Sequence, residues 1–288
     1  MAEALHDDYP DVLVHTLAYY WSKYPPREIK LHPNVVVDFA PRNACHYHPF
    51  GSCAYNEQFK GLWTAIRRWR KLTPHTWVWL YDQRGAFEPR PTLAHIGLYF
   101  QELAAAEVGG VYMFIYDFGP WQWLGDLRSY LFAKLLWDPQ YDVSSGIREF
   151  VGAYYGAAAK AMLAYVKSTQ EAVNYARSKK GGMISQMAGF HDNSQCIPTG
   201  EAIKKWSGIL NEAEEMAAND QGGPLRRVKL ARFWVQYCAL MYLETDDPVR
   251  ASASRGLAMT ARAAGVPDAT VRQILERAGK EPEKEGKD

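Results

Sequence analysis

Residues 109–119 read Gly-Gly-Val-Tyr-Met-Phe-Ile-Tyr-Asp-Phe-Gly, and this stretch decides the expected fold. A glycine pair opens it, an apolar run rich in aromatic and β-branched residues follows, and Asp117 comes near its end. An apolar run bounded by glycines is typical of a strand buried on both faces of a parallel sheet. Because parallel sheets carry their chemistry at the carboxyl ends of such strands, we expect Asp117 to lie at a functional edge.

Three earlier segments have the same character and are expected to be strands: residues 11–20, 35–40 and 76–82. The third of them also ends in a carboxylate, Asp82. Between the strands, apolar residues recur at helical spacing, first at Phe59, Leu62, Trp63 and Ile66 and then at Leu93, Ile96, Phe100 and Leu103. Strands that alternate with amphipathic helices predict βαβ units and a parallel sheet.

From about residue 125 the hydrophobic period is helical throughout. Helices are expected around 127–135, 147–155, 157–178, 201–218 and 225–243, followed by one between Asp247-Pro248 and Gly265 and a short last one around 271–275. The sequence therefore divides into a partial (β/α) barrel at 1–125, a C-terminal helical domain at 126–279 and a charged tail at 280–288 that we expect to be disordered.

The predicted fold class is α/β: the C-terminal half of a TIM-type (β/α)8 barrel, with about four βα units, followed by an all-helical domain. A closed barrel of this type needs eight strands and typically about 250 residues. Four strands alone leave two open sheet edges, which favour aggregation. We therefore expect the missing N-terminal barrel half, or a second chain, as a partner.

The composition is that of a globular protein and excludes two classes of partner. Of the 288 residues 48% are hydrophobic and 23% are charged, and the formal net charge is +1. This balance gives no electrostatic surface for nucleic acid, and no apolar run reaches the roughly 18 residues of a membrane span. The first eight residues lack the basic start and apolar core of a signal peptide, so the sequence assigns no localisation.

Two segments of the expected helical region are distinctive: residues 126–139 read DLRSYLFAKLLWDP and residues 147–158 read IREFVGAYYGAA. Together with Thr16-Leu17-Ala18-Tyr19 and the pair Pro25-Pro26, they resemble the DUF4838 family over residues 10–165. This resemblance implies a glycoside-hydrolase-like protein related at fold level to α-glucuronidases and hexosaminidases. It also implies an N-terminal β-rich domain, then a (β/α)8 barrel and helices, in proteins that are often exported.

The chain departs from the family pattern at two strands. In the family the third strand of this series often ends Trp-Asp-Tyr and the fourth ends Phe-Glu. This sequence has Trp79-Leu80-Tyr81 in the third and Met113 near the position of the glutamate in the fourth. Its acidic residues Asp82 and Asp117 are therefore shifted along their strands.

Asp82 and Asp117 are the catalytic candidates. Glycoside hydrolysis usually needs two carboxyl groups, one that protonates the leaving oxygen and one that activates water or attacks the sugar. The alternative is that strand-end aspartates cap the loop or helix that follows. Asp38, one residue inside the end of its strand, is expected either to pair with Arg42 or to take a catalytic role.

The segment from Arg42 to Cys53 follows a predicted strand, where the substrate loops of a barrel lie. Arg42 is expected to bind a sugar carboxylate. His46 and His48 are expected to form hydrogen bonds with sugar hydroxyls. The alternative is a purely structural loop. The spacing Cys-His-x-His-x4-Cys matches no standard zinc pattern, so neither a metal nor a cofactor is predicted.

Aromatic residues complete the predicted substrate-binding set, because flat apolar rings suit the faces of pyranose sugars. Tyr81, Trp121 and Trp123 are its members, and the two tryptophans lie in an expected loop. Trp79 is a further candidate for stacking on a sugar ring. Because Trp77 and Trp79 alternate with Val78, one face of the strand is expected to be barrel interior and the other to face a helix, and core packing is the favoured role of these two tryptophans.

The function predicted is that of a glycoside-hydrolase-like protein acting on a carbohydrate substrate, with O-glycosyl hydrolysis by a carboxylate pair when the barrel is complete. The alternatives are a non-catalytic remnant that binds carbohydrate or a partner, and a truncated reading frame.

Overall fold

The computed structural model describes residues 2–41, 61–81, 93–114, 123–180, 198–220 and 223–279. Its sheet consists of four strands, β1 (Val14–Ala18), β2 (Val35–Phe39), β3 (Thr76–Tyr81) and β4 (Gly110–Phe114). They are all parallel and lie in the order β1-β2-β3-β4, so each strand pairs with its neighbour in the sequence. The mixed α/β class with a parallel sheet is confirmed.

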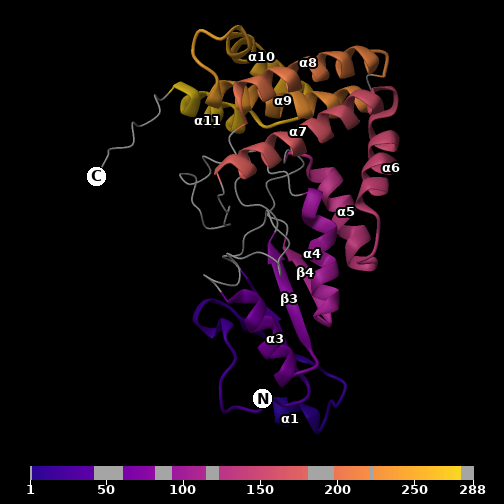
Figure 1. The fold of residues 1–288 in the computed structure, drawn as a ribbon, viewed down its shortest axis with the longest axis vertical. Coiled ribbons are helices and arrows are strands. Elements are labelled where there is room, and N and C mark those ends of the chain that lie inside the picture. Colours follow the sequence, from indigo (N-terminus) through magenta and orange to yellow (C-terminus); the bar gives the residue numbers. More distant parts are fainter. Residues whose placement is uncertain are drawn as a thin grey trace, which may run out of the picture.

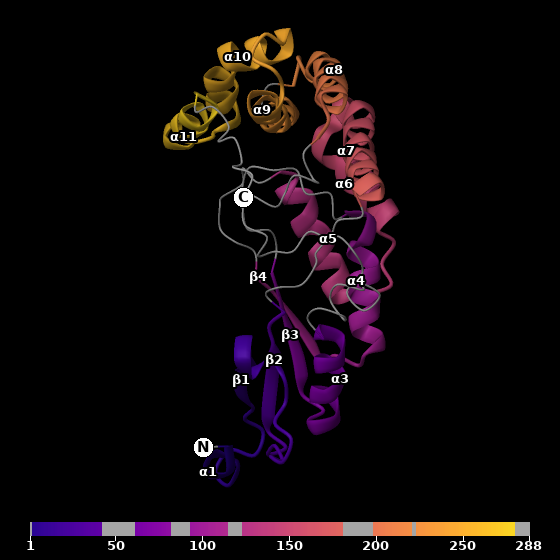
Figure 2. The ribbon, with the colours of Figure 1, turned by 60° about the vertical axis from the view of Figure 1, so that its left-hand side comes forward.

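Helices α3 (Leu62–Leu72) and α4 (Leu93–Ala105) connect the strands and cover one face of the sheet, as Figure 2 shows. The apolar stripe of α3 includes Leu62, Ile66 and Trp69, and it shares one core with β2 and β3. Two short helices, α1 (Ala2–His6) and η1 (Tyr20–Lys23), lie on either side of β1 in the sequence. The Trp69 indole donates a hydrogen bond to the Lys23 carbonyl at 2.8 Å, which fixes the end of η1 on α3.

The rest of the described chain is helical. It contains α5 (Gly125–Trp137), α6 (Val143–Tyr155), η2 (Gly156–Ala158), α7 (Ala159–Lys180), α8 (Gly200–Met216), α9 (Pro224–Tyr242), α10 (Pro248–Ala264) and α11 (Asp268–Gly279). The molecule is elongated, with α1 and the sheet at one end and α8 to α11 at the other, and α5 and α6 run between them (Figure 1).

Local sequence signals set the ends of these helices. Asp142 caps α6 by accepting hydrogen bonds from the backbone N–H groups of Ser144 and Ser145 at 3.1 and 3.0 Å. Asp247 caps α10 in the same way, with a proline at its first position. Gly265 ends α10 at a φ of 78°, a left-handed conformation that favours glycine.

The helices α8, α9 and α10 pack around a core in which Trp206, Trp234 and Phe233 are almost fully buried. The helices α9 and α10 are antiparallel, since Arg250 near the start of α10 donates to the Leu243 carbonyl at the end of α9 at 2.6 Å. Among the described residues no helix has both the length and the hydropathy to cross a membrane.

Candidate functional site

Among the described residues, helices pack against one face of the sheet, and the opposite face, which we call the open face, is only partly covered. In β3 the side chains of Val78 and Leu80 are 0% and 3% exposed and join the core formed with α3 and α4. Because side chains alternate along a strand, Trp77, Trp79 and Tyr81 point to the opposite face, where each is only partly buried. Trp77 and Trp79, for which core packing was favoured, therefore lie opposite the core shared with α3 and α4 and are not part of that core.

Four aromatic rings on the open face touch one another, and we call them the aromatic face: Trp79, Tyr81, Tyr112 and Phe114. Trp79 pairs in register with Tyr112, and their ring centroids are 4.3 Å apart. Phe114, which pairs with Tyr81, lies 5.8 Å from Trp79 and 6.0 Å from Tyr81. Tyr112 is 48% exposed, so solvent reaches this surface. The aromatic face thus ends at the carboxyl edge of the sheet.

A histidine–aspartate pair lies on the same face of the sheet, in β1 and β2. His15 in β1 and Asp38 in β2 contact each other through Nδ1 and Oδ2 at 2.9 Å. An aspartate that accepts a hydrogen bond from Nδ1–H of a histidine favours the tautomer with the proton on Nδ1. In this tautomer Nε2 can accept a hydrogen bond. The His15 ring also meets the Trp77 ring edge-on at 4.9 Å. His15 is thus the observed partner of Asp38, while the predicted partner, Arg42, lies outside the described residues.

Close packing fixes Trp77 on this face. A Cβ added to Gly110 in the neighbouring strand would lie 2.8 Å from Cδ2 of the Trp77 indole, which is closer than real Cβ contacts come. The second glycine of the pair that opens β4 therefore lets the indole lie against the backbone of that strand.

Most of the predicted site residues lie outside the described part of the chain: Asp82, Asp117, Arg42, His46, His48 and Trp121. Their roles stay predictions. Tyr81 is described and belongs to the aromatic face. It is the last residue of β3, directly before Asp82, and its register partner Phe114 is the last residue of β4.

Trp123 lies away from the sheet, in the helical core. It is 2% exposed, and its Nε1 donates a hydrogen bond to the Tyr165 hydroxyl at 3.2 Å. Because its ring is buried and its one polar atom has a partner, Trp123 packs helices together and offers no surface to a sugar.

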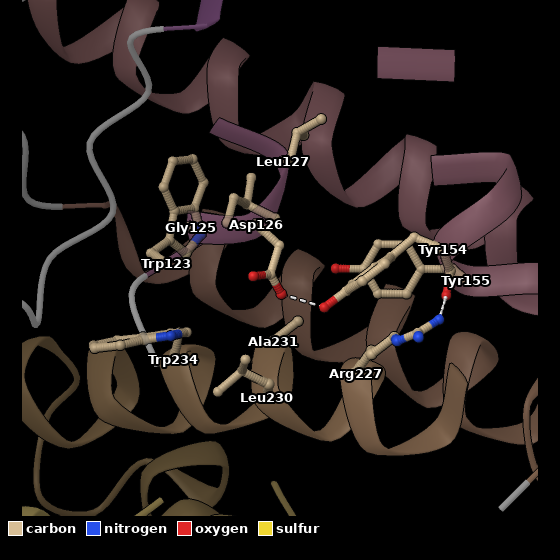
Figure 3. Close-up of a pocket in the computed structure, with 11 residues that line it drawn as sticks. Trp123, Gly125, Asp126, Leu127, Tyr154, Tyr155, Arg227, Leu230, Ala231 and Trp234 are labelled. Atoms are coloured by element: carbon tan, nitrogen blue, oxygen red, sulfur yellow. Dashed lines mark hydrogen bonds between the residues drawn. The ribbon is translucent and has the colours of Figure 1, made fainter. Parts of the chain in front are cut away.

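Trp123 lines a small cavity between α5, α6 and α9 (Figure 3). The cavity has a volume of about 20 Å3, which is room for a single water. At its side the Tyr154 hydroxyl donates to Asp126, and the Arg227 guanidinium lies 4.0 Å over the Tyr154 ring. Burial, reinforced by the Asp126 carboxylate, raises the pKa of Tyr154 above its usual range. This network joins three helices and is too tight to be a substrate site.

The described residues hold no cluster of three or more His, Cys, Asp or Glu side chains that could bind a metal ion. The hydrogen-bonding groups of the open face include the imidazole of His15, the carboxylate of Asp38 and the phenols of Tyr81 and Tyr112. Such groups can donate hydrogen bonds to, or accept them from, hydroxyl groups.

Residues 1–167 match the sequence model of a family described as "Domain of unknown function (DUF4838)". The chain belongs to the DUF4838 family. The DUF4838 match includes the whole sheet, α5, α6 and the first part of α7, and the family resemblance read from residues 126–139 and 147–158 is thereby confirmed. No curated protein and no solved structure matches this DUF4838 chain.

The sequence prediction of the site did not include three residues of the open face, His15, Tyr112 and Phe114. A signal for Tyr112 exists, since it stands two residues before Phe114 in a strand and therefore shares its face. His15 carries no such signal, because its role depends on the pairing of β1 with β2.

Proposed function

We propose that this DUF4838 chain is the sugar-binding part of a glycoside-hydrolase-like protein, built as the C-terminal half of a TIM-type (β/α)8 barrel. The aromatic face carries this proposal. It ends at the carboxyl edge of a parallel sheet, the edge at which barrels of this type bind their substrates. Partly exposed aromatic rings such as Trp79 and Tyr112 offer the flat apolar surface that a sugar ring packs against.

Polar groups beside the aromatic face would orient the sugar. His15 Nε2 accepts and the Tyr112 hydroxyl donates or accepts hydrogen bonds, which matches the hydroxyls of a pyranose. Asp38 is the single carboxylate in the four strands, and it already pairs with His15. The described residues thus support binding, whereas hydrolysis rests on the predicted pair Asp82 and Asp117.

The open face also supports the proposal of a partner. The described helices cover one face of the sheet, and a closed barrel needs eight strands rather than the four described here. We therefore propose that the other half of a barrel, or a second chain, covers the amino-terminal part of the open face. The exposed Leu17 side chain, 52% exposed in β1, is part of the surface that such a partner would bury.

The experiment that tests sugar binding is a titration of tryptophan fluorescence with soluble plant and microbial polysaccharides. The variant is Trp79→Ala, and the matched control is Trp137→Ala, because Trp137 is 92% exposed on α5, away from the sheet. We expect the first variant to lose roughly tenfold in affinity, the loss of an aromatic contact worth about 1–1.5 kcal/mol. Equal affinities of both variants, or no binding by the parent chain, would contradict the proposal.

A second assay separates binding from hydrolysis. Release of reducing sugar from the bound polysaccharide is measured for the parent chain, Asp82→Asn and Asp117→Asn, together with any partner that co-purifies. Turnover that both substitutions abolish without loss of binding supports the carboxylate pair. Binding with no turnover in any of the three proteins supports the non-catalytic alternative, and turnover that persists in both variants rules out these two aspartates.

A further inference from the structure

The helical end of the molecule contains a hollow that has no part in the proposed sugar site. It lies between α8, α9 and α10 and has a volume of about 480 Å3. Pockets that bind small molecules fall between about 300 and 1,000 Å3. Each helix contributes one side: Ser207, Asn211 and Glu214 from α8, Lys229, Arg232 and Gln236 from α9, and Ser252, Gly256 and Thr260 from α10.

One carboxylate in this hollow forms ion pairs with two cations. Glu214 accepts from Arg232 Nε at 2.8 Å and from Lys229 Nζ at 3.4 Å. Among the described residues that line the hollow no other is charged, so their formal charges sum to +1. The three side chains are only 10% to 28% exposed, and at such partly buried sites an uncompensated charge attracts a counter-ion more strongly than it does in bulk water.

Arg232 is held rigidly in this arrangement. Its residue is 8% exposed, and besides Glu214 it donates to the Ser207 carbonyl at 3.0 Å, the Ser207 hydroxyl at 3.2 Å and Asn211 Oδ1 at 2.7 Å. Lys229 makes the longer bond to the shared carboxylate and is the more exposed of the two cations. A fixed guanidinium beside a movable ammonium is a preorganised site for a carboxylate.

The remaining lining provides room for an organic body. Apolar side chains come from Val235, Ala239, Pro248, Val249 and Ala253. Gly256 keeps α10 close to α9 here, because a Cβ at this position would lie 2.8 Å from Nε2 of Gln236. A ligand whose acid group lies at Lys229 would therefore extend its body between α9 and α10.

We propose that the hollow between α8, α9 and α10 binds a small organic carboxylate, with its acid group at Lys229 and Arg232. The inference does not depend on sugar binding at the sheet, since no residue is shared between the two sites. The two cations select an acid group, and the experiment below shows which kind of ligand body is preferred.

The test is isothermal titration calorimetry of the full chain with sodium hexanoate, sodium gluconate and inorganic phosphate. Each probe is used up to about 10 mM, where a ligand with a Kd near 1 mM approaches saturation. Saturable binding of hexanoate or gluconate supports the proposal and shows whether an apolar or a hydroxylated body is preferred. Binding of phosphate alone, or of none of the three, overturns it.

Two variants locate the binding. Lys229→Met removes the movable cation, and Ser252→Phe fills the hollow from an exposed position on α10. We expect each to weaken carboxylate binding at least roughly tenfold. Lys229→Met removes a hydrogen bond to a charged group, and Ser252→Phe occupies the volume that the body of the ligand needs. The control is Lys205→Met, which makes the same charge change on α8 outside the hollow. Should Lys229→Met fail to fold, Ser252→Phe decides, and unchanged affinity in Ser252→Phe overturns the proposal.

Discussion

Two glycines of α6 provide a stability test in which the same substitution has opposite effects. Gly146 faces α5, and a Cβ added there would lie 2.6 Å from Tyr141 Cε1 and 2.9 Å from Leu131 Cδ2. Gly152, in the same helix, has no atom within 4 Å of its added Cβ. We expect Gly146→Ala to destabilise the protein and Gly152→Ala to stabilise it.

The magnitudes follow from the surroundings of Gly146. The Tyr141 ring cannot move freely, because its hydroxyl donates to Glu149 at 3.0 Å and contacts the Tyr130 hydroxyl at 3.3 Å. Overpacking against such a fixed ring costs about 1–3 kcal/mol, and alanine regains up to about 1 kcal/mol of helix propensity. The net loss of unfolding free energy for Gly146→Ala is therefore up to about 2 kcal/mol, because the overpacking term exceeds the propensity term. Gly152→Ala has only the propensity term and gains about 0.5–1 kcal/mol.

The assay is thermal unfolding of both variants and the parent chain, followed by far-ultraviolet circular dichroism. Each kcal/mol corresponds to roughly 2–4 °C in a protein of this size, so the Tm of Gly152→Ala should exceed that of Gly146→Ala by up to roughly 12 °C. If Gly146→Ala melts at or above the temperature of the parent chain, the packing of α6 against Tyr141 and Leu131 is not as described.

Three further predictions concern other parts of the chain. Asp247→Ala should lower the Tm at pH 7, because the hydrogen bond from Lys204, together with the α10 backbone, holds the pKa of Asp247 below its usual range. The stabilisation by Asp247 is therefore present above about pH 4 and is lost as the pH falls further. Melting curves at pH 7 and pH 3 should show that the difference in Tm between the variant and the parent chain shrinks at the lower pH. Tyr154→Phe removes the donor to Asp126 and should cost about 1–3 kcal/mol in urea unfolding; an unchanged midpoint would contradict the network of Figure 3. Val78→Ala, at a fully buried position facing α3 and α4, should cost roughly 2 kcal/mol in the same assay, two methyl groups plus a cavity, and a loss under about 0.5 kcal/mol would contradict the packed face.

The strands and the helix ends could be predicted because their signals are local. The segment 76–82 becomes β3 at Thr76–Tyr81, since β-branched and aromatic residues suit a pleated surface. The cap of α10 is Asp247, which the sequence indicates through the pair Asp247-Pro248. In each case the deciding side chain lies within a few residues of the backbone group that it satisfies.

Contacts between distant residues could not be predicted. His15 and Asp38 are 23 residues apart, and Trp123 meets Tyr165 at a separation of 42, so neither the pair on the open face nor the burial of a loop tryptophan has a local signal. The first strand was predicted over 11–20 and is shorter, because Tyr20 adopts a positive φ of 50° and starts a 3-10 helix. The hollow at Lys229 likewise exists only once three helices are packed.

The two faces of β3 separate stability from binding. Val78 and Leu80 are already buried by α3 and α4, so the sheet gains its hydrophobic free energy from one side. Trp77, Trp79 and Tyr81 remain partly exposed on the other side, and each Å2 of apolar surface left in water forgoes about 25 cal/mol. That loss is recovered only when a ligand or another protein segment covers the rings. The aromatic side of β3 is consistent with the sugar-binding role proposed for the open face, since polar residues at these positions would avoid the cost.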